Sequence, residues 1–198
     1  MSKSTASNLE NLSPFDEKTN DLNVIIDTPK GSRNKYSFDE ELKLFKLSGV
    51  LPVGSYFPFD FGFIPRTKGE DGDPIDILIL MDESAFAGCL ISARLIGVIE
   101  ANQTERDGKT VRNDRLIAVA SKSHIHAHVK SFDDLNEKLI DEIEHFFISY
   151  NEAKGKRFEP LGRFDAQVAE KLIREAMKAL TKKKSKTKSK PKTKRKSA

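Results

Sequence analysis

Residues 70–80 read EDGDPIDILIL, a turn crowded with acidic side chains that leads directly into an apolar strand. Glu70, Asp71, Asp73 and Asp76 place four carboxylates within seven residues. Carboxylates this close repel one another unless a cation lies between them. Because Asp, Gly and Pro favour a bend of the backbone, several of these carboxylates can converge at the start of the strand. Hard oxygen ligands that converge in this way are typical of a Mg²⁺ site.

A turn of this composition also has an ordinary interpretation. Asp, Gly and Pro build many solvated turns ahead of strands that bind no ion. A calcium loop of the EF-hand type is disfavoured, because a strand follows the turn where that motif requires a helix and a terminal bidentate acid. On these residues alone, a metal site and a plain turn both stay open.

The composition indicates one globular domain. A chain of 198 residues can bury a substantial core, and 37% hydrophobic with 32% charged residues favours a soluble protein. No apolar run approaches the length that crosses a membrane. Residues 1–20 lack the apolar centre of a signal peptide, and Cys89 is the only cysteine. We therefore expect a reducing, cytoplasmic compartment and no disulfide.

The net charge of +4 is unevenly distributed. Residues 182–198 hold ten Lys and Arg side chains and no acid, whereas the rest of the chain holds 24 basic and 30 acidic residues. Residues 1–20 and 182–198 are predicted to be disordered, which leaves residues 21–181 as the folded domain. The lysine-rich segment suits contact with nucleic acid or anionic surfaces, and a purely solubilising role stays open.

The order of the expected elements indicates an α+β domain. Seven short strands come first, at Leu22–Asp27, Lys35–Phe38, Leu42–Leu47, Tyr56–Ile64, Ile75–Met81, Ile91–Glu100 and Asp114–Ala120. Two amphipathic helices follow, one over Phe132–Ala153 with Ser131 as its cap and one over Asp165–Leu180. Many short strands followed by helices predict a barrel-like sheet with helices beside it.

Several segments, taken in order, resemble a known family. Asp71 to Asp76 match D-x-D-P-x-D, the signature of the soluble family I inorganic pyrophosphatases, also called inorganic diphosphatases. Further similar segments over about residues 22–160 are IIDTP from Ile25, Lys35-Tyr36, FPFDFGFIP from Phe57, NDRLIAV from Asn113, and His145-Phe-Phe through Tyr150. Each similarity is weak alone, but together they are specific, so the chain resembles a divergent member of this family.

The resemblance implies a five-stranded, OB-like β-barrel with flanking helices that hydrolyses inorganic pyrophosphate to two phosphates using several Mg²⁺ ions. It also implies a homo-oligomer, commonly a hexamer. By similarity, Asp73 helps to deprotonate a metal-bridging water, while Asp71, Asp76, Asp27 and the aligned Asn113 serve the metal. The residues similar to those that hold phosphate oxygens are Lys35, Arg115, Tyr150 and Lys156. Acids for divalent ions and bases for phosphate are what attack on a compact polyanion requires.

The chain departs from the family pattern inside the expected site. Where the family usually has an arginine, this chain has Gly49, and where it has two tyrosines, this chain has Phe57 and Phe61. The usual lysine is replaced by Asn151. Two further acids of the family are replaced by Gln103 and Asn113. A phenylalanine cannot donate to phosphate, and an amide oxygen can ligate a metal but carries no charge. The resemblance therefore leaves two interpretations. One is an active pyrophosphatase with fewer or shifted metals; the other is a protein that binds phosphate or pyrophosphate with weak or no turnover.

The hairpin that leads to Arg115 decides which side chains face the site. If Asp107-Gly108 forms a two-residue turn, Asn102 pairs with Asn113 and Glu100 pairs with Arg115. Because side chains alternate along a strand, Asp114 is expected to face away from its two neighbours. The site face is then predicted to carry two neutral amides and an ion pair.

Two further patterns have competing interpretations. His124, His126 and His128 alternate, so on a strand they could bind Zn²⁺ or Ni²⁺, but a polar loop is favoured. Four phenylalanines from Phe57 to Phe63 also alternate and are expected in the barrel core. A platform for stacking nucleic-acid bases is disfavoured, because such a platform needs neighbouring basic residues and this segment offers Asp60 instead.

Overall fold

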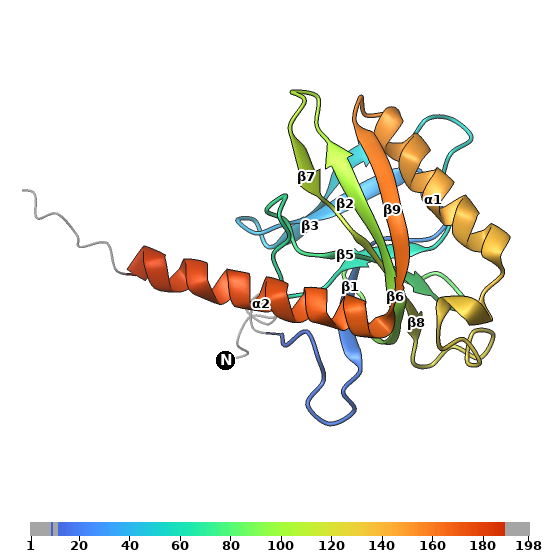
Figure 1. Ribbon diagram of the computed structural model, residues 1–198, viewed down its shortest axis with the longest axis horizontal. Helices are drawn as coiled ribbons and strands as arrows, with labels where there is room; N and C mark the ends of the chain where they lie inside the picture. Colours follow the sequence, from blue (N-terminus) through green and yellow to red (C-terminus); the bar gives the residue numbers. More distant parts are fainter. Residues whose placement is uncertain (1–8, 10–11, 189–198) are drawn as a thin grey trace, which may run out of the picture.

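The centre of the fold is a ring of five hydrogen-bonded strands. In the computed structural model, which describes residue 9 and residues 12–188, β1 pairs with β4, β4 with β5, β5 with β8, β8 with β6, and β6 again with β1 (Figure 1). These strands are β1 (Leu22–Thr28), β4 (Asp60–Phe63), β5 (Asp76–Leu80), β6 (Leu90–Thr104) and β8 (Arg115–Ala120). The ring confirms the predicted OB-like, five-stranded α+β architecture.

The apolar run after the acidic turn is continuous because both of its faces are buried. In β5, Leu78 and Leu80 point into one core cluster with α1, whereas Ile77 and Ile79 point into a second cluster with α2. Each fully buried aliphatic side chain stabilises the fold by about 1.5–3 kcal/mol relative to exposure. The same burial fixes the position of the acidic residues at the start of this strand.

Strand β6 is longer than predicted and carries two strands that were not predicted. It continues past Glu100 to Thr104 and pairs there with β7 (Thr110–Arg112) and β9 (Arg157–Asp165). Strand β7 is too short for a periodic signal. Strand β9 contains Pro160 and Gly162, which disfavour strand in a sequence.

The strands β2 (Asn34–Asp39) and β3 (Leu44–Val50) form a separate hairpin sheet. The strand predicted from Tyr56 begins only at Asp60, so Phe57 lies in the preceding loop. Phe57 and Phe61 are nonetheless buried in the core against α1 as predicted, and Phe59 packs partly against them, whereas Phe63 lines the cleft. The hairpin forms one side of the cleft described below.

Helix α1 (Glu137–Glu152) begins later than predicted. A separate 3-10 turn, η2 (Phe132–Asp134), comes first, and the predicted cap Ser131 belongs to that turn. The cap of α1 is Asn136, whose side chain accepts a hydrogen bond from the backbone N–H of Lys138 at 2.9 Å. The helix packs beside β9, and its buried stripe includes Ile140, Ile143 and Phe147 as expected from the helical spacing.

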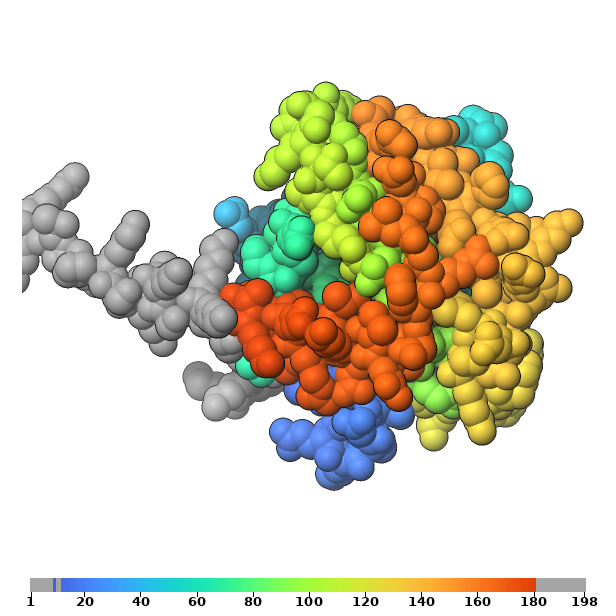
Figure 2. All heavy atoms as spheres, viewed as in Figure 1, coloured from blue at the N-terminus to red at the C-terminus, as the bar shows by residue number. Residues whose placement is uncertain are grey.

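Helix α2 (Ala166–Lys188) continues past the predicted end at Leu180, so residues 182–188 are helical where disorder was predicted. Residues 189–198, the rest of the lysine-rich segment, lie outside the described residues. Figure 2 shows α2 lying across one face of the molecule with the blue N-terminal segment next to it.

Part of the N-terminal segment predicted as disordered is attached to the barrel. Phe15 forms a bridge with Leu22 and packs against the core cluster that α2 covers. The guanidinium of Arg174 on α2 lies 5.0 Å from the centre of the Phe15 ring. Residues 1–8 and 10–11, which belong to the same prediction, are outside the described part of the chain.

Candidate active site

An open cleft of about 660 Å³ lies at the mouth of the barrel, between the β2–β3 hairpin, the acidic turn before β5 and the end of α1. Every site residue predicted from the sequence lines this cleft: Asp27, Lys35, Asp71, Asp73, Asp76, Asn113, Arg115, Tyr150 and Lys156. Residues more than a hundred positions apart are brought together because the ring of strands closes. The contacts within the cleft show what each side chain can do.

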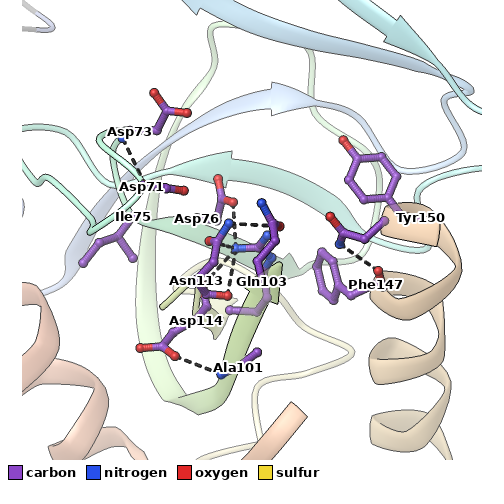
Figure 3. A network of polar contacts seen from close by, with 12 residues as sticks. Asp71, Asp73, Ile75, Asp76, Ala101, Gln103, Asn113, Asp114, Phe147 and Tyr150 are labelled. Carbon is purple, nitrogen blue, oxygen red and sulfur yellow. Dashed lines mark hydrogen bonds and ion pairs between the residues drawn. The ribbon is translucent and has the colours of Figure 1, made fainter. Parts of the chain in front are cut away.

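The acidic wall of the cleft comes from the turn and the first residue of β5. Oδ1 of Asp71 accepts a hydrogen bond from the backbone N–H of Asp73 at 3.1 Å, which fixes the bend. Figure 3 shows the carboxylates of Asp71 and Asp76 close to each other, whereas that of Asp73 points away from both. Burial, together with repulsion from Asp76 and Asp73, raises the pKa of Asp71. A cation between Asp71 and Asp76 would relieve that repulsion.

The floor of the cleft is built around Arg115. Its Nη1 lies 2.9 Å from Oδ2 of Asp76 and also donates to the side-chain oxygen of Asn113. The same nitrogen donates to the backbone carbonyls of Asn113 at 3.3 Å and Asp114 at 3.1 Å. Nδ2 of Asn113 in turn donates to Oε1 of Gln103 at 3.2 Å (Figure 3). The predicted metal ligand Asn113 therefore directs its oxygen to a guanidinium.

The basic wall begins with Lys35 on β2. Its Nζ lies 2.7 Å from both carboxylate oxygens of Asp27 and 4.2 Å from the centre of the Phe61 ring. Burial raises the pKa of Asp27 to about 6, because it outweighs the opposing effect of the Lys35 ammonium. Asp27, which the resemblance placed with the metal ligands, is thus held by a lysine.

The end of α1 adds a cation that the sequence analysis missed. Lys154 lines the cleft, and its Nζ donates to the hydroxyl of Tyr150 and lies 3.9 Å from the centre of that ring. Burial, followed by repulsion from Lys35 and Lys156, lowers the pKa of Lys154 to about 8. Lys154 lies two residues past the end of α1, and its four-residue spacing from Tyr150 could still have indicated this neighbour.

The neutral residue next to Tyr150 takes a structural role. Asn151 is only 2% exposed, and its Nδ2 donates to the carbonyl oxygen of Phe147 at 2.8 Å. The predicted phosphate ligand Lys156 is held at 2.7 Å by Glu105. A phosphate oxygen would have to compete with this carboxylate, so Lys154 is the more available ammonium at this end of the cleft.

The predicted register of the hairpin was wrong by one residue. Asn102 pairs with Arg112 and not with Asn113, and Ile99, not Glu100, is opposite Arg115. The cause is the turn. The N–H of Glu105 donates to the carbonyl of Lys109 at 2.8 Å, which encloses three residues, and Gly108 has a φ of +84°. The shift brings Gln103, not Asn102, to the site face beside Asn113.

The outer face of the same hairpin carries its own ion pairs. Arg112 contacts the carboxylates of Glu100 and Asp114. Oδ1 of Asp114 also accepts the N–H of Ala101 at 3.0 Å, so Asp114 faces away from its neighbours as predicted. The predicted ion pair of Glu100 with Arg115 does not form; Arg115 pairs with Asp76.

Comparison with known proteins agrees with this geometry. A family model described as inorganic pyrophosphatase matches residues 24–181. The chain belongs to the inorganic pyrophosphatase family. It is 39% identical over 165 residues to an inorganic pyrophosphatase of Synechocystis sp., covering 83% of this chain and 95% of that protein. A relative of the same name from Nostoc sp. is 39% identical over 166 residues, with 84% and 95% covered.

Solved structures of inorganic pyrophosphatases share the fold. The one from Thermus thermophilus superposes with a TM-score of 0.78 and 31% identity, covering 88% of this chain and 99% of that chain. The one from Neisseria gonorrhoeae gives a TM-score of 0.78 and 27% identity, with 87% and 98% covered. The relatives match almost their full length, so the described domain corresponds to a whole inorganic pyrophosphatase fold.

In this member of the family, the side chains of the cleft offer suitable oxygen ligands for a divalent ion at one place, beside Asp71 and Asp76. Among the described side chains, no three His, Cys, Asp or Glu residues gather closely enough to hold a metal ion. The carboxylates of Asp71 and Asp76, completed by water, are the hard oxygen pair that suits Mg²⁺. His124, His126 and His128 lie in the loop between β8 and η2 and not on a strand. This agrees with the polar loop that the sequence analysis favoured.

Proposed function

We propose that the protein hydrolyses inorganic pyrophosphate to two phosphates with Mg²⁺ as its cofactor. The observation that carries this proposal is the division of one cleft into an acidic wall and a basic wall. Asp71, Asp73 and Asp76 form the first, and Lys35 and Lys154 form the second. A diphosphate in the cleft would have carboxylates with their cation on one side and fixed ammonium groups on the other. This arrangement suits a polyanion whose charge increases at the leaving phosphate.

Each wall has a distinct part in the proposed reaction. Mg²⁺, when bound, supplies charge neutralisation and lowers the pKa of the attacking water. Asp71 and Asp76 would hold it, and Asp73 would accept the proton that the water loses. Lys35 and Lys154 would bind phosphate oxygens and stabilise the negative charge that forms on the leaving phosphate.

A second function, pyrophosphate binding with little or no turnover, is favoured by one feature of the floor. Arg115 neutralises Asp76, and the amides of Gln103 and Asn113 add no charge for further metal ions. We favour hydrolysis because the three aspartates of the acidic turn all line the cleft.

Phosphate release from pyrophosphate, measured colorimetrically with Mg²⁺ and with EDTA, tests the proposal. The wild type is expected to release phosphate over many turnovers only with Mg²⁺. Asp73→Asn is expected to lower the rate by roughly 100-fold or more, the usual contribution of a general base. Glu70→Gln is the matched control, because Glu70 belongs to the same turn but does not line the cleft. Absence of release by the wild type, or equal rates for wild type and Asp73→Asn, would overturn the proposal.

The proposal includes a homo-oligomer, a hexamer by family resemblance, in the cytoplasm. Exposed apolar side chains along and after β3, at Leu44, Leu47, Val50 and Val53, support assembly, and light scattering tests it. None of the described helices is long and apolar enough to pass through a membrane. Contact of residues 182–198 with nucleic acid or anionic surfaces stays a prediction, which a gel shift with a chain truncated at Thr181 tests.

A further inference from the structure

The guanidinium of Arg115 is fixed inside the protein. The side chain is only 4% exposed, and the rings of Phe147 and Phe158 lie 5.0 Å and 5.4 Å from its central carbon. These rings come from α1 and β9, the two elements that cover this side of the barrel. A cation held this far from water needs close oxygen partners, because it has lost its hydration. The aromatic faces add a weaker attraction.

The partners of this cation are oxygens of the types that bind a hard metal ion. Nη1 contacts one carboxylate oxygen of Asp76, the side-chain oxygen of Asn113, and the backbone carbonyls of Asn113 and Asp114. Carboxylate, amide and backbone carbonyl oxygens are the usual ligands of divalent cations such as Ca²⁺ and Mg²⁺. A positively charged nitrogen therefore lies at the centre of a cation-type oxygen cluster.

The orientation of the two amides is set by the same network. Nδ2 of Asn113 donates to Oε1 of Gln103 at 3.2 Å, so the oxygen of Asn113 is left to face Arg115. Nε2 of Gln103 donates to Glu105 at 2.6 Å. At the floor, the negative charge of Asp76 is therefore balanced by the positive charge of Arg115. The amides of Asn113 and Gln103 carry no charge.

We propose that Arg115 takes the place of a divalent ion at the floor of the cleft, so that each chain binds one divalent ion, at Asp71 and Asp76. The remaining positive charge that a diphosphate needs is then part of the protein. The inference depends on the proposed function only for the identity of that anion. Because the guanidinium is covalently attached, pyrophosphate binding would require the capture of fewer free ions from solution.

The experiment counts Mn²⁺ ions bound by the full chain without pyrophosphate, using calorimetric titration and electron paramagnetic resonance. The wild type is expected to bind one Mn²⁺, and Asp71→Asn is expected to abolish it. The double variant Asn113→Asp/Arg115→Met removes the guanidinium and adds an isosteric carboxylate, so it is expected to bind two. Asn102→Asp is the control, since Asn102 precedes Gln103 on β6 but does not line the cleft, and it is expected to bind one.

The count in the wild type decides the inference even if the double variant fails to fold. A wild-type count of zero, or of two or more, would overturn it, as would a folded double variant that still binds one ion. The proposed function fails separately. One bound Mn²⁺ without phosphate release would contradict hydrolysis alone, and two bound ions with phosphate release would contradict only the role of Arg115.

Discussion

Nζ of Lys35 lies 2.7 Å from both carboxylate oxygens of Asp27, where the β2–β3 hairpin meets the barrel. The two side chains are only 14% and 8% exposed, so the pair is shielded from solvent. It holds the hairpin against β1 and places the ammonium at the edge of the cleft. The structure and the proposed anion binding therefore depend on the same contact.

Removing Lys35 is expected to destabilise the fold strongly. Lys35→Met leaves a buried carboxylate without its partner, which typically costs about 3–5 kcal/mol of unfolding free energy. Urea denaturation measures the loss, and Asp27→Asn added to Lys35→Met should recover part of it. Lys46→Met is the control, because the pair of Lys46 with Asp39 is solvent-exposed and should contribute little. Equal losses in both single variants would contradict a special role for the buried pair.

The raised pKa of Asp27 predicts a pH dependence of stability. Its pKa is about 6 in the folded protein against an ordinary value of 3.8, so the folded state holds this proton more tightly. Its stabilising contribution is therefore complete below pH 3.8 and is lost as the pH rises through about 6. The loss is on the order of 3 kcal/mol. Unfolding free energies measured from pH 4 to 7 should show this decline in the wild type and lack it in Asp27→Asn. Parallel curves for the two proteins would contradict the assignment.

Lys154 is expected to bind the anion in a pH-dependent way. With a pKa lowered to about 8, it loses its charge well below the ordinary range of a lysine, so pyrophosphate affinity should fall as the pH rises through about 8. Lys154→Met should weaken binding roughly 10- to 100-fold below pH 8, the range for a charged hydrogen bond. Lys154→Arg should keep the affinity and remove the pH step. Calorimetric titration measures both effects.

The control for Lys154 is Lys138→Met, which removes an exposed lysine from the first turn of α1. The affinity of the Lys138→Met variant for pyrophosphate should equal that of the wild type. A pH step that persists unchanged in Lys154→Arg would assign the titration to another group.

Gly62 is expected to tolerate no side chain. A Cβ built there would lie 2.2 Å from the carbonyl oxygen of Ile25 on the paired strand β1. Gly62→Ala must therefore push β4 away from β1, at a cost of about 1–3 kcal/mol or more. Gly49→Ala, on β3 with nothing within 4 Å of its Cβ position, should leave the stability unchanged or slightly raised. Thermal unfolding compares the two, and equal midpoints would contradict the packing argument.

The sequence predicted those parts of the fold that depend on local patterns. The continuous apolar run Ile77–Leu80 and the apolar stripe along α1 predicted the core, because a strand buried on both faces and a helix buried on one face each leave a recognisable apolar pattern. Strand β9 was not predictable, since its backbone pairs with β6 despite Pro160 and Gly162. Tertiary pairing here overrides local propensity.

The candidate site was likewise predicted only in part. Asp71, Asp73 and Asp76 were singled out from their spacing in the turn together with the family resemblance, and they line the cleft. The partners of Arg115 were not predicted, because the predicted ion pair with Glu100 assumed a hairpin turn one residue too short, and the observed partner Asp76 lies on another strand, β5. A shift of one residue moves every side chain to the opposite face. Lys154 was missed because it lies beyond the end of α1.

The most direct test of the account follows pyrophosphate itself by phosphorus NMR, with purified full-length protein and Mg²⁺. The account predicts that the pyrophosphate signal is replaced by two phosphates per molecule consumed, well beyond one equivalent of protein, and that Asp71→Asn stops this conversion. A pyrophosphate signal that shifts or broadens on binding but persists undiminished would contradict hydrolysis and identify the protein as a binding homologue.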